Sequence, residues 1–335
     1  MAATLRRGTV TAVGERHPGL ARIEVDGLPA VAYPGLTGPV ALGDEVIVNT
    51  QARELGLGSG GFDIVAVNLT RGLGLAPAPG AHVVSGPYAP LQSAVRHVEE
   101  DGPLAPWLGG LPVVCCSLHS QLAPVCAGLG EGLATVYVQH GGGALPVALS
   151  DAVRQLKQRG LLVAAVAVAP CFAGDAQAVT VAAALQWAAA RGAQAVVCGI
   201  GPGVVGTASA YGHGGLAAGD AANAAAALGG RPVLVARVSA ADPRERHRGL
   251  SHHTVSALSL CRSAPFVAWP AGADIQDSAV ERPDGVPLLR DVATAGWRAA
   301  CAGLPLSHMG RGPDEDPHFF AAAYAAGVLA RELVA

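Results

Sequence analysis

The chain has 335 residues, which is enough for two domains that each bury a core. Its 22 basic and 25 acidic side chains give a net charge of −3, which argues against a general nucleic-acid binder with a basic face. Only one basic residue, Lys157, is a lysine, so Walker-type phosphate binding and Schiff-base chemistry lack their usual residue.

Hydrophobic residues make up 51% of the sequence, which raises the question of a membrane protein. The longest apolar run, residues 161–170, covers only half of a bilayer, and we interpret it as a buried strand. Residues 1–10 contain a basic pair without a following apolar stretch, so no signal peptide is expected. Seven cysteines without a C-x-x-C pair suit reduced thiols. We therefore expect a cytoplasmic protein that binds neither membrane nor nucleic acid.

The first part of the chain, residues 1–70, is predicted to form a small β-barrel. Five short apolar segments alternate there with turn-rich stretches, at a spacing typical of a small antiparallel barrel. These segments are 7–13, 21–27, 30–35, 44–50 and 62–68. Residues 71–90 are rich in glycine and proline and are predicted to be a connector.

Residues 91–335 are predicted to form an α/β/α domain with a mostly parallel sheet. Continuous apolar strands alternate with alanine-rich helices, the pattern of a sheet that is covered on both faces. The expected strands are 111–117, 133–139, 161–169, 193–200, 231–239, 264–270 and 302–308. The expected helices are 149–160, 178–192, 216–230, 252–264 and 317–334.

Chemically reactive side chains follow several of these strands. In an open parallel sheet, ligands bind in the crevice beyond the carboxyl ends of the strands. Loops that are distant in the sequence should therefore meet along one edge of the sheet. The loops concerned are 115–121, 139–146, 169–175, 199–215, 239–253 and 308–317.

The most reactive of these loops, residues 237–254, leads into the helix predicted to begin after Ser251. Ser251 is well placed as the N-cap, with its oxygen accepting an amide hydrogen of the first turn. His252 and His253 then occupy the first two helical positions, where the helix dipole favours neutral imidazoles. Neutral imidazoles ligate metals or polarise carbonyl groups. Because successive helical residues point about 100° apart, we expect the two histidines to have different roles.

The same loop carries donors for a metal ion. Asp242, His247, His252 and His253 have the donor types for zinc, manganese or iron, although their spacing matches no standard metalloenzyme motif. A divalent metal is thus the candidate cofactor, with His252 and His247 as its candidate ligands.

Three arginines of this loop, Arg244, Arg246 and Arg248, suit bidentate capture of phosphate or carboxylate. A small anionic ligand is therefore expected. An equally weighted alternative is an ion-paired loop whose arginines hold helix ends or a partner subunit.

Gly201, Gly203 and Gly206 match G-x-G-x-x-G by letter, but Pro202 lacks an amide hydrogen and no acidic residue for a ribose follows. We keep the three glycines as candidate ligand-binding residues. A tight structural turn is the interpretation we favour. His213, farther along this loop, is expected to be a solvated loop histidine.

In the last loop, Asp316 and Pro317 have the sequence of an N-cap and a first helical position. Arg311 and Asp314 have no such structural role, and we expect them at the ligand site. The acids at 314–316 also have the oxygens that Mg²⁺ prefers, although solvated capping acids are the interpretation we favour.

Two catalytic alternatives find less support. The sequence HGGGA, residues 140–144, is similar to the oxyanion loop of lipases, but the G-x-S-x-G elbow of an esterase is missing. Cys116 and His119 make a nucleophile and base only if they meet in space. We favour a buried cysteine and a histidine at a helix start.

Several of these segments together resemble a bacterial family known as domain of unknown function 3866. The resemblance rests on GPGVVGT, GGRPV, ADPRERHRGLSHHT and MGRGPDEDP, on GGGALP, and on the N-terminal RRGTV, LTGPV, GDEVIVNT and LGLGSGGFDIV. It extends over nearly the whole chain and implies a cytoplasmic bacterial protein. It implies no activity and no catalytic residue.

The function we expect is hydrolysis or group transfer on a phosphorylated or carboxylated small molecule, assisted by a metal. The arginines of 244–248 clamp the anion, and His252 or His253 serves as ligand or electrophile. Asp242 orients a histidine or acts as base.

Two other classes of function stay open. One is a non-catalytic sensor or scaffold whose charged loop forms a homodimer interface, since the charge-poor, alanine-rich surface favours oligomers. The other is a nucleotide-binding enzyme that uses the loop at 201–206.

Overall fold

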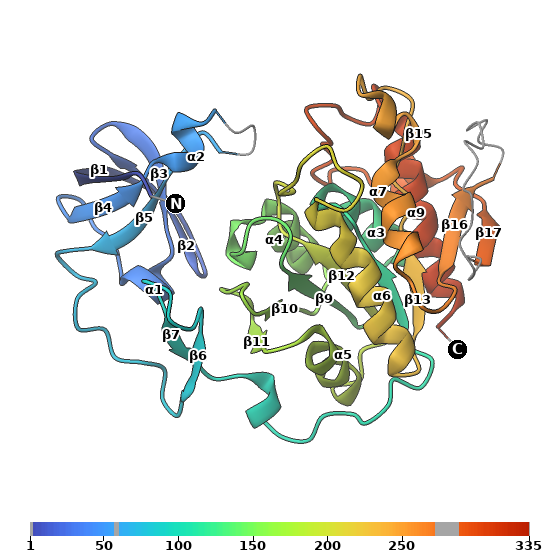
Figure 1. Ribbon diagram of the computed structural model, residues 1–335, viewed down its shortest axis with the longest axis horizontal. Coiled ribbons are helices and arrows are strands. Elements are labelled where there is room, and N and C mark those ends of the chain that lie inside the picture. Colours follow the sequence, from blue (N-terminus) through green and yellow to red (C-terminus); the bar gives the residue numbers. More distant parts are fainter. Residues whose placement is uncertain (1–2, 57–59, 272–287, 335) are drawn as a thin grey trace. The chain divides into compact units, whose positions relative to one another are not determined.

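The computed structural model describes residues 3–56, 60–271 and 288–334. The chain divides into two compact units, Met1–His97 and Val98–Ala335, which are described separately below (Figure 1). A closed barrel in the first unit and an all-parallel sheet with helices in the second confirm the predicted fold class.

The barrel contains all five strands that the sequence predicts, closed in the order β1-β2-β3-β5-β4. Its strands are β1 Leu5–His17, β2 Leu20–Val25, β3 Leu28–Ala32, β4 Glu45–Asn49 and β5 Asp63–Asn68. Alternate residues such as Val46 and Val48 are buried, because successive side chains of a strand point to opposite faces. The pairs are antiparallel except for β3 with β5, which run parallel.

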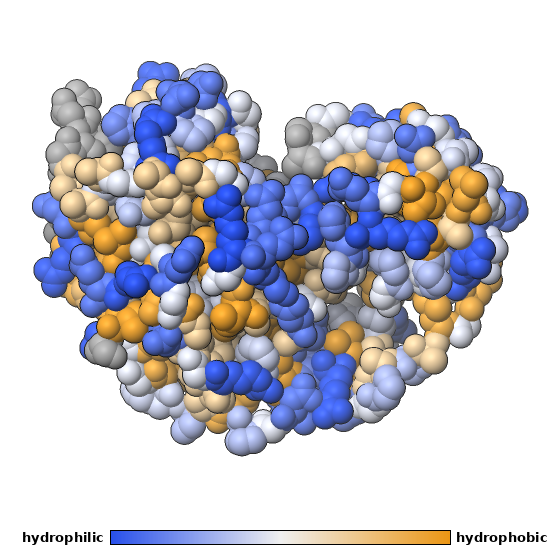
Figure 2. Space-filling model, turned by 180° about the vertical axis from the view of Figure 1, so that it is seen from behind, coloured by the Kyte–Doolittle hydropathy of each residue, from blue (hydrophilic) through white to orange (hydrophobic). Residues whose placement is uncertain are grey.

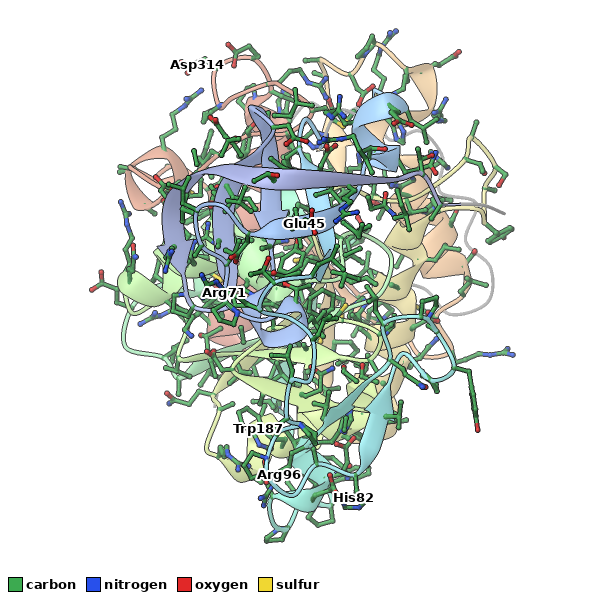
Figure 3. The ribbon with its side chains drawn as sticks, turned by 90° about the vertical axis from the view of Figure 1, so that its left-hand side faces the viewer. Glu45, Arg71, His82, Arg96, Trp187 and Asp314 are labelled. Carbon is green, nitrogen blue, oxygen red and sulfur yellow. The ribbon has the colours of Figure 1, made fainter. Side chains whose placement is uncertain are left out.

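Short elements complete the first unit. They are the helices α1 Pro34–Thr37 and α2 Gln51–Glu54 and the two-stranded hairpin of β6 Val83–Ser85 and β7 Ser93–Val95. Strand β6 lies within the segment 71–90, which the sequence predicts as a connector. At the barrel, Arg71 Nε donates to Asp44 Oδ1 at 2.8 Å and Arg7 pairs with Glu45; Figure 3 labels Arg71 and Glu45.

The second unit is built on an eight-stranded sheet whose described pairs are all parallel. The order is β11-β10-β9-β12-β8-β13-β16-β17. The strands are β8 Pro112–Cys115, β9 Thr135–His140, β10 Ala164–Val168, β11 Ala176–Ala178, β12 Ala195–Ile200, β13 Arg231–Leu234, β16 Phe266–Pro270 and β17 Leu288–Val292.

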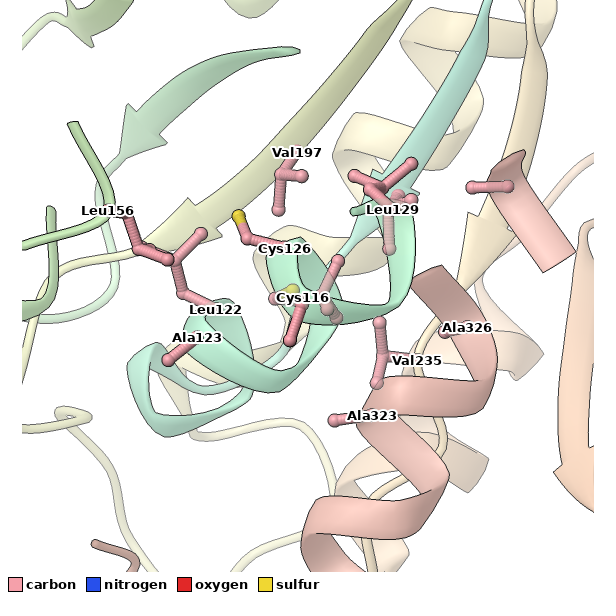
Figure 4. Close-up of a cluster of buried hydrophobic side chains, with 14 of the residues drawn as sticks. Cys116, Leu122, Ala123, Cys126, Leu129, Leu156, Val197, Val235, Ala323 and Ala326 are labelled. Atoms are coloured by element: carbon pink, nitrogen blue, oxygen red, sulfur yellow. The ribbon is translucent and has the colours of Figure 1, made fainter. Parts of the chain in front are cut away.

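Helices cover both faces of this sheet. One face packs against α3 Leu122–Leu129, α4 Asp151–Gln158, α8 Trp297–Ala300 and α9 Pro317–Glu332. The other packs against α5 Val181–Ala190, α6 Ala217–Ala227 and α7 His252–Ser259. Figure 4 shows side chains of α3 and α9 together on the first face. These two helices approach closely because Gly327 has no Cβ. A Cβ at this position would lie 2.0 Å from the Val125 carbonyl oxygen.

Six of the seven predicted strands of this unit are confirmed, and one is wrong. Residues 302–308 form a turn and an irregular segment instead of a strand. Strands β11 and β17 and helix α3 lie outside the elements that the sequence predicts. No helix in the described part of the chain is long and apolar enough to cross a membrane.

The strand order reverses around β8. The chain passes from β8 to β9 and outward to β11, then returns to place β12 between β9 and β8, and finally crosses to β13 on the other side of β8. Crevices at such reversals are the usual ligand sites of open parallel sheets. The loops that follow β8, β12 and β13, together with the segment before α9, carry the side chains of the candidate site.

Candidate functional site

Three loops that are distant in the sequence contact one another at the carboxyl edge of the sheet. The ring of His213, in the β12–α6 loop, stacks on that of His253 in α7 with 3.8 Å between ring centroids. Arg311, just before α9, donates to Asp242 of the β13–α7 loop at 3.2 Å. His308 contacts Ser120, which follows β8, at 3.2 Å. The structure thus links the segments 199–215, 239–253 and 308–317, and the last of these also contacts the loop 115–121.

Ser251 begins helix α7 as the sequence predicts. Its Oγ accepts the backbone hydrogen of His253 at 3.2 Å and lies 2.7 Å from His247 Nδ1. Before it, β14 Val238–Ser239 and β15 Gly249–Leu250 form a short antiparallel hairpin. The cap and the hairpin together place three histidines of the loop and helix start side by side.

Four imidazoles form one cluster, which we name the histidine cluster: His213, His247, His252 and His253. His252 contacts all three others, with ring centroids 4.6 Å from His253, 4.8 Å from His247 and 5.3 Å from His213. Among the described residues, His213, His252 and His253 can each offer one ligand atom within 4.8 Å of the other two. His247 does not belong to that group of three.

Two nitrogen atoms of the histidine cluster are buried without a hydrogen-bond partner in the structure. They are His213 Nδ1 and His252 Nε2. His213 Nε2 lies 3.0 Å from the Ala210 carbonyl oxygen, which only accepts, so Nε2 carries the proton and Nδ1 keeps its lone pair. A histidine whose other N–H is held by a carbonyl is the usual arrangement of a metal ligand.

His253 is held by a buried arginine. Arg237, of which only 2% is exposed, places its NH1 group 3.0 Å from His253 Nδ1. Because a guanidinium only donates, Nδ1 accepts and the neutral ring carries its proton on Nε2. Arg237 also donates to Asp242 at 3.4 Å. The hydrogen bonds of Arg237 to Asp242 and to His253 therefore fix the orientation of the His253 ring.

Asp242 is buried and forms a network of ion pairs with three arginines. Arg244 binds it in a bidentate manner with two bonds of 2.9 Å, and Arg237 and Arg311 donate to its second oxygen. Burial raises the pKa of the Asp242 carboxyl, but the hydrogen bonds and charges of Arg244 and Arg237 outweigh burial and lower the pKa well below its usual range. A carboxylate held ionised in this way is poorly suited to act as a proton-accepting base.

Asp316 extends the network to helix α9. It occupies the N-cap position with Pro317 after it, as predicted, but its side chain makes no capping hydrogen bond. Asp316 Oδ2 instead accepts from Ser239 Oγ at 2.7 Å and from Arg311 Nε at 3.2 Å. The predicted N-cap position is therefore confirmed, but the carboxylate binds Ser239 and Arg311 instead of the first turn of the helix.

Burial and positive charge keep these imidazoles neutral. Burial, followed by the charges of Arg237 and Arg244, lowers the pKa of His247 to about 3. Burial and neighbouring cationic groups lower the pKa of His252 to about 4 and of His253 to about 2. Burial, followed by the charge of Arg237, also lowers the pKa of His308 to about 3. Neutral rings keep lone pairs for a metal ion.

The other predicted ligand residues lie at different distances from the cluster. Arg246 and Arg248 are exposed, and neither side chain makes a hydrogen bond or ion pair among the described residues. Arg246 nevertheless contributes positive charge at His252. Asp314 is exposed and pairs with Arg298 at 2.8 Å, and Figure 3 shows it at the periphery of the molecule. The structure therefore does not join Asp314 to the histidine cluster.

The glycines of the 201–206 loop allow backbones to approach. A Cβ on Gly201 would lie 2.0 Å from the Ala144 carbonyl oxygen, and Ala144 donates its amide hydrogen to Pro202 at 2.9 Å. A Cβ on Gly206 would lie 2.7 Å from the Cβ of His213. Close packing thus accounts for Gly201 and Gly206 without a bound ligand, and Gly206 leaves room for His213. Gly203 has a φ of +74°, which suits a tight turn.

Cys116 and His119 show no nucleophile and base arrangement. His119 Nδ1 lies 3.1 Å from the Ile200 carbonyl oxygen, and its Nε2 lies 2.7 Å from Ser150 Oγ. Burial raises the pKa of the Cys116 thiol well above its usual range. A buried, protonated cysteine and a fully hydrogen-bonded histidine support the structural interpretation.

Sequence reasoning missed two residues that the geometry makes central. His213 is buried against α7 instead of solvated, and Arg237 lies inside the network instead of merely flanking the loop. For His213 the available signal was its position in G-H-G-G, where glycines on both sides let the backbone of the loop approach the helix. For Arg237 the signal was an arginine at the end of an apolar strand, a position that is usually buried.

Comparison with known families agrees with the motifs. The model of the family described as Protein of unknown function (DUF3866) matches residues 29–327, most of the chain. The protein belongs to the DUF3866 family. A search of curated proteins gave no match. Membership of DUF3866 confirms the resemblance noted in the sequence, and the description of the family specifies no activity.

Proposed function

We propose that this DUF3866 protein is an enzyme that binds a divalent transition-metal ion at the histidine cluster and uses it for hydrolysis or group transfer. The substrate is a small anionic molecule. His213, His252 and His253 hold the ion, and Zn²⁺ is the first choice because it favours three imidazoles and an open position. Such an ion acts as a Lewis acid on a phosphoryl or carbonyl oxygen.

The observation that carries the proposal is the pair of buried, unpartnered nitrogens, His213 Nδ1 and His252 Nε2. A buried polar atom without a partner costs about 1–3 kcal/mol, and an ion that bound both nitrogens would remove that cost at two atoms at once. A tetrahedral zinc site brings its nitrogens to roughly 3.4 Å from one another. The ligand atoms of His213, His252 and His253 already lie within 4.8 Å of one another, so the ion would draw them closer by at most roughly 1.4 Å.

His253 has a double role in this proposal. Its Nδ1 is hydrogen-bonded to Arg237 when no metal is present, so the ion and the guanidinium compete for one imidazole. Asp242 keeps Arg237 in place as the positioning carboxylate, and it does not act as the base.

We also propose a bacterial cytoplasmic setting and a homodimer. The seven cysteines are all free thiols, as in a reducing compartment. Large apolar side chains such as Leu73, Tyr88 and Trp107 are exposed. Figure 2 shows hydrophobic residues spread among hydrophilic ones on the visible face, which leaves apolar surface for a second copy. Mass in solution, measured by light scattering, tests the dimer.

The experiment that tests the metal site compares His213→Asn and His252→Asn with the control His318→Asn in the full chain. His318 lies on α9 outside the cluster. Metal analysis of purified protein and titration of metal-stripped protein with Zn²⁺ are the measurements. Wild type and the control should bind one ion, and each cluster variant should bind it more than about 100-fold more weakly. Equal zinc affinity in all four proteins excludes the proposed metal site.

A further inference from the structure

The three arginines of the 244–248 loop differ in how fully they are paired. Arg244 is occupied, because its guanidinium makes a bidentate pair with Asp242. Arg246 and Arg248 are exposed, and neither side chain makes a hydrogen bond or ion pair with the described residues. Of these two exposed arginines, Arg246 is the one whose charge helps to lower the pKa of His252. Both arginines flank His247 in the sequence, and the ring of His247 lies 4.8 Å from that of His252.

Charges behind the histidine cluster are not balanced. Three guanidinium groups, Arg237, Arg244 and Arg311, face two carboxylates, Asp242 and Asp316, which leaves an excess of one positive charge. The imidazoles are neutral and compensate none of it. One buried donor of this network, Arg237 Nε, and one buried acceptor, Asp316 Oδ1, have no partner in the structure. The interior side of the cluster is therefore prepared for negative charge.

A bound divalent ion raises this excess from one to three positive charges, and Arg246 adds a fourth at the exposed side. A neutral substrate such as an amide or a sugar leaves all of that charge uncompensated. A carboxylate supplies one negative charge, whereas the phosphate group of a monoester supplies close to two at neutral pH. Guanidinium groups also match the geometry of phosphate oxygens.

We propose that the ligand of this site is a phosphomonoester whose phosphate group bridges the metal ion and Arg246. This inference rests on the proposed metal site and names the substrate class for it. Arg246 is then the anion-binding residue of the loop, while Arg244 is a structural partner of Asp242. Arg248, two residues away and equally exposed, has no part in binding.

The test uses the full chain loaded with one equivalent of Zn²⁺ and inorganic phosphate as the probe, measured by titration calorimetry. Wild type, Arg246→Gln and the matched control Arg248→Gln are compared, with acetate as the monoanionic probe. The zinc content of each protein is measured first. We expect phosphate affinity to fall about tenfold in Arg246→Gln and to stay unchanged in Arg248→Gln, since a charge-assisted hydrogen bond of this kind is worth roughly that factor.

The outcomes separate the two proposals. Zinc bound with equal phosphate affinity in all three proteins overturns the role of Arg246 and leaves the metal site standing. Zinc bound with acetate as tight as phosphate overturns the phosphomonoester as the ligand class. Failure of wild type to bind zinc overturns the proposed function and, with it, the bridged phosphate.

Discussion

Two helices of the parallel-sheet unit begin in the same way and differ in what surrounds that beginning. At α4, Ser150 accepts the amide hydrogen of Val153 at 3.0 Å and its hydroxyl bonds His119 at 2.7 Å. At α7, Ser251 caps the helix and bonds His247 at the same 2.7 Å. Each helix start is therefore a serine N-cap joined to an imidazole.

The difference lies in the nitrogen atoms that remain. Both nitrogens of His119 have partners, the Ile200 carbonyl and the Ser150 hydroxyl. Around α7, His213 Nδ1 and His252 Nε2 have none, and a buried arginine stands behind the rings. Unsatisfied buried atoms, and not the presence of histidine at a helix start, distinguish a candidate binding site from a structural cap.

The largest effect should come from removing the carboxylate behind the α7 cluster. Asp242→Asn leaves the buried guanidinium of Arg237 without its main counter-charge, which costs about 3–5 kcal/mol of unfolding free energy. The matched change at α4 is Asp151→Asn, which removes the exposed partner of Arg154 and costs at most about 1 kcal/mol. Urea unfolding followed by tryptophan fluorescence reports on this unit, since all four tryptophans lie after residue 98. Equal losses of unfolding free energy in Asp242→Asn and Asp151→Asn contradict the distinction between the two helix starts.

Acidification of metal-stripped protein should lower the free energy of unfolding through the histidine at each helix start. The loss should be larger for His247 at α7 than for His119 at α4. Burial lowers the pKa of His119 to about 4, against an opposing bond to Ile200, while burial and the charges of Arg237 and Arg244 lower that of His247 to about 3. An unfolded imidazole titrates near about 6.5, so below this pH the unfolded chain binds more protons and stability is lost.

By pH 5 the loss amounts to about 2 kcal/mol for buried His247 and about 1 kcal/mol for half-buried His119, where water screens the charge. Unfolding free energies of wild type, His247→Gln and His119→Gln between pH 7 and pH 5 measure these contributions. Each variant should lose less stability than wild type over this interval, and His247→Gln the least. A loss that is the same in all three proteins refutes the assignment to these rings.

The sequence predicts most of the fold because its strands are long, continuous apolar runs, which need little tertiary context to recognise. Strand β17 is not predicted from the sequence, because four of its five residues are exposed and no long apolar run marks it. The segment 302–308 was mistaken for a strand because it is apolar, yet its leucines pack against the helices of one sheet face.

The sequence predicts those parts of the site that depend on strand order and on contacts between near neighbours. Topology brings the three loops to one edge, and Ser251 caps α7 by a bond between near neighbours. Which of Arg244, Arg246 and Arg248 is paired and which is free depends on tertiary packing, and their alternation in the sequence does not indicate it. His213 enters the cluster only because its loop folds onto α7.

Removing each cap hydroxyl should give similar stability losses but different effects on metal. Ser150→Ala and Ser251→Ala each lose an N-cap bond worth about 1 kcal/mol, measurable by thermal unfolding. Zinc affinity should fall about tenfold in Ser251→Ala, since this cap sets the positions of His252 and His253. It should stay unchanged in Ser150→Ala. If zinc affinity falls equally in Ser150→Ala and Ser251→Ala, the cap of α7 does not position the metal ligands.

The smallest expected effect concerns the glycine that makes room for His213. In Gly206→Ala the new Cβ lies 2.7 Å from the Cβ of His213, closer than real Cβ contacts, so the histidine loop has to shift. In the control Gly141→Ala the nearest atom is Pro170 Cδ at an ordinary 3.7 Å. Because the 206 loop is exposed, stability should change by less than about 0.5 kcal/mol, while zinc affinity falls about fivefold. Zinc binding that is unaffected in Gly206→Ala argues that His213 is not a ligand, because a displaced ligand changes affinity and a displaced bystander does not.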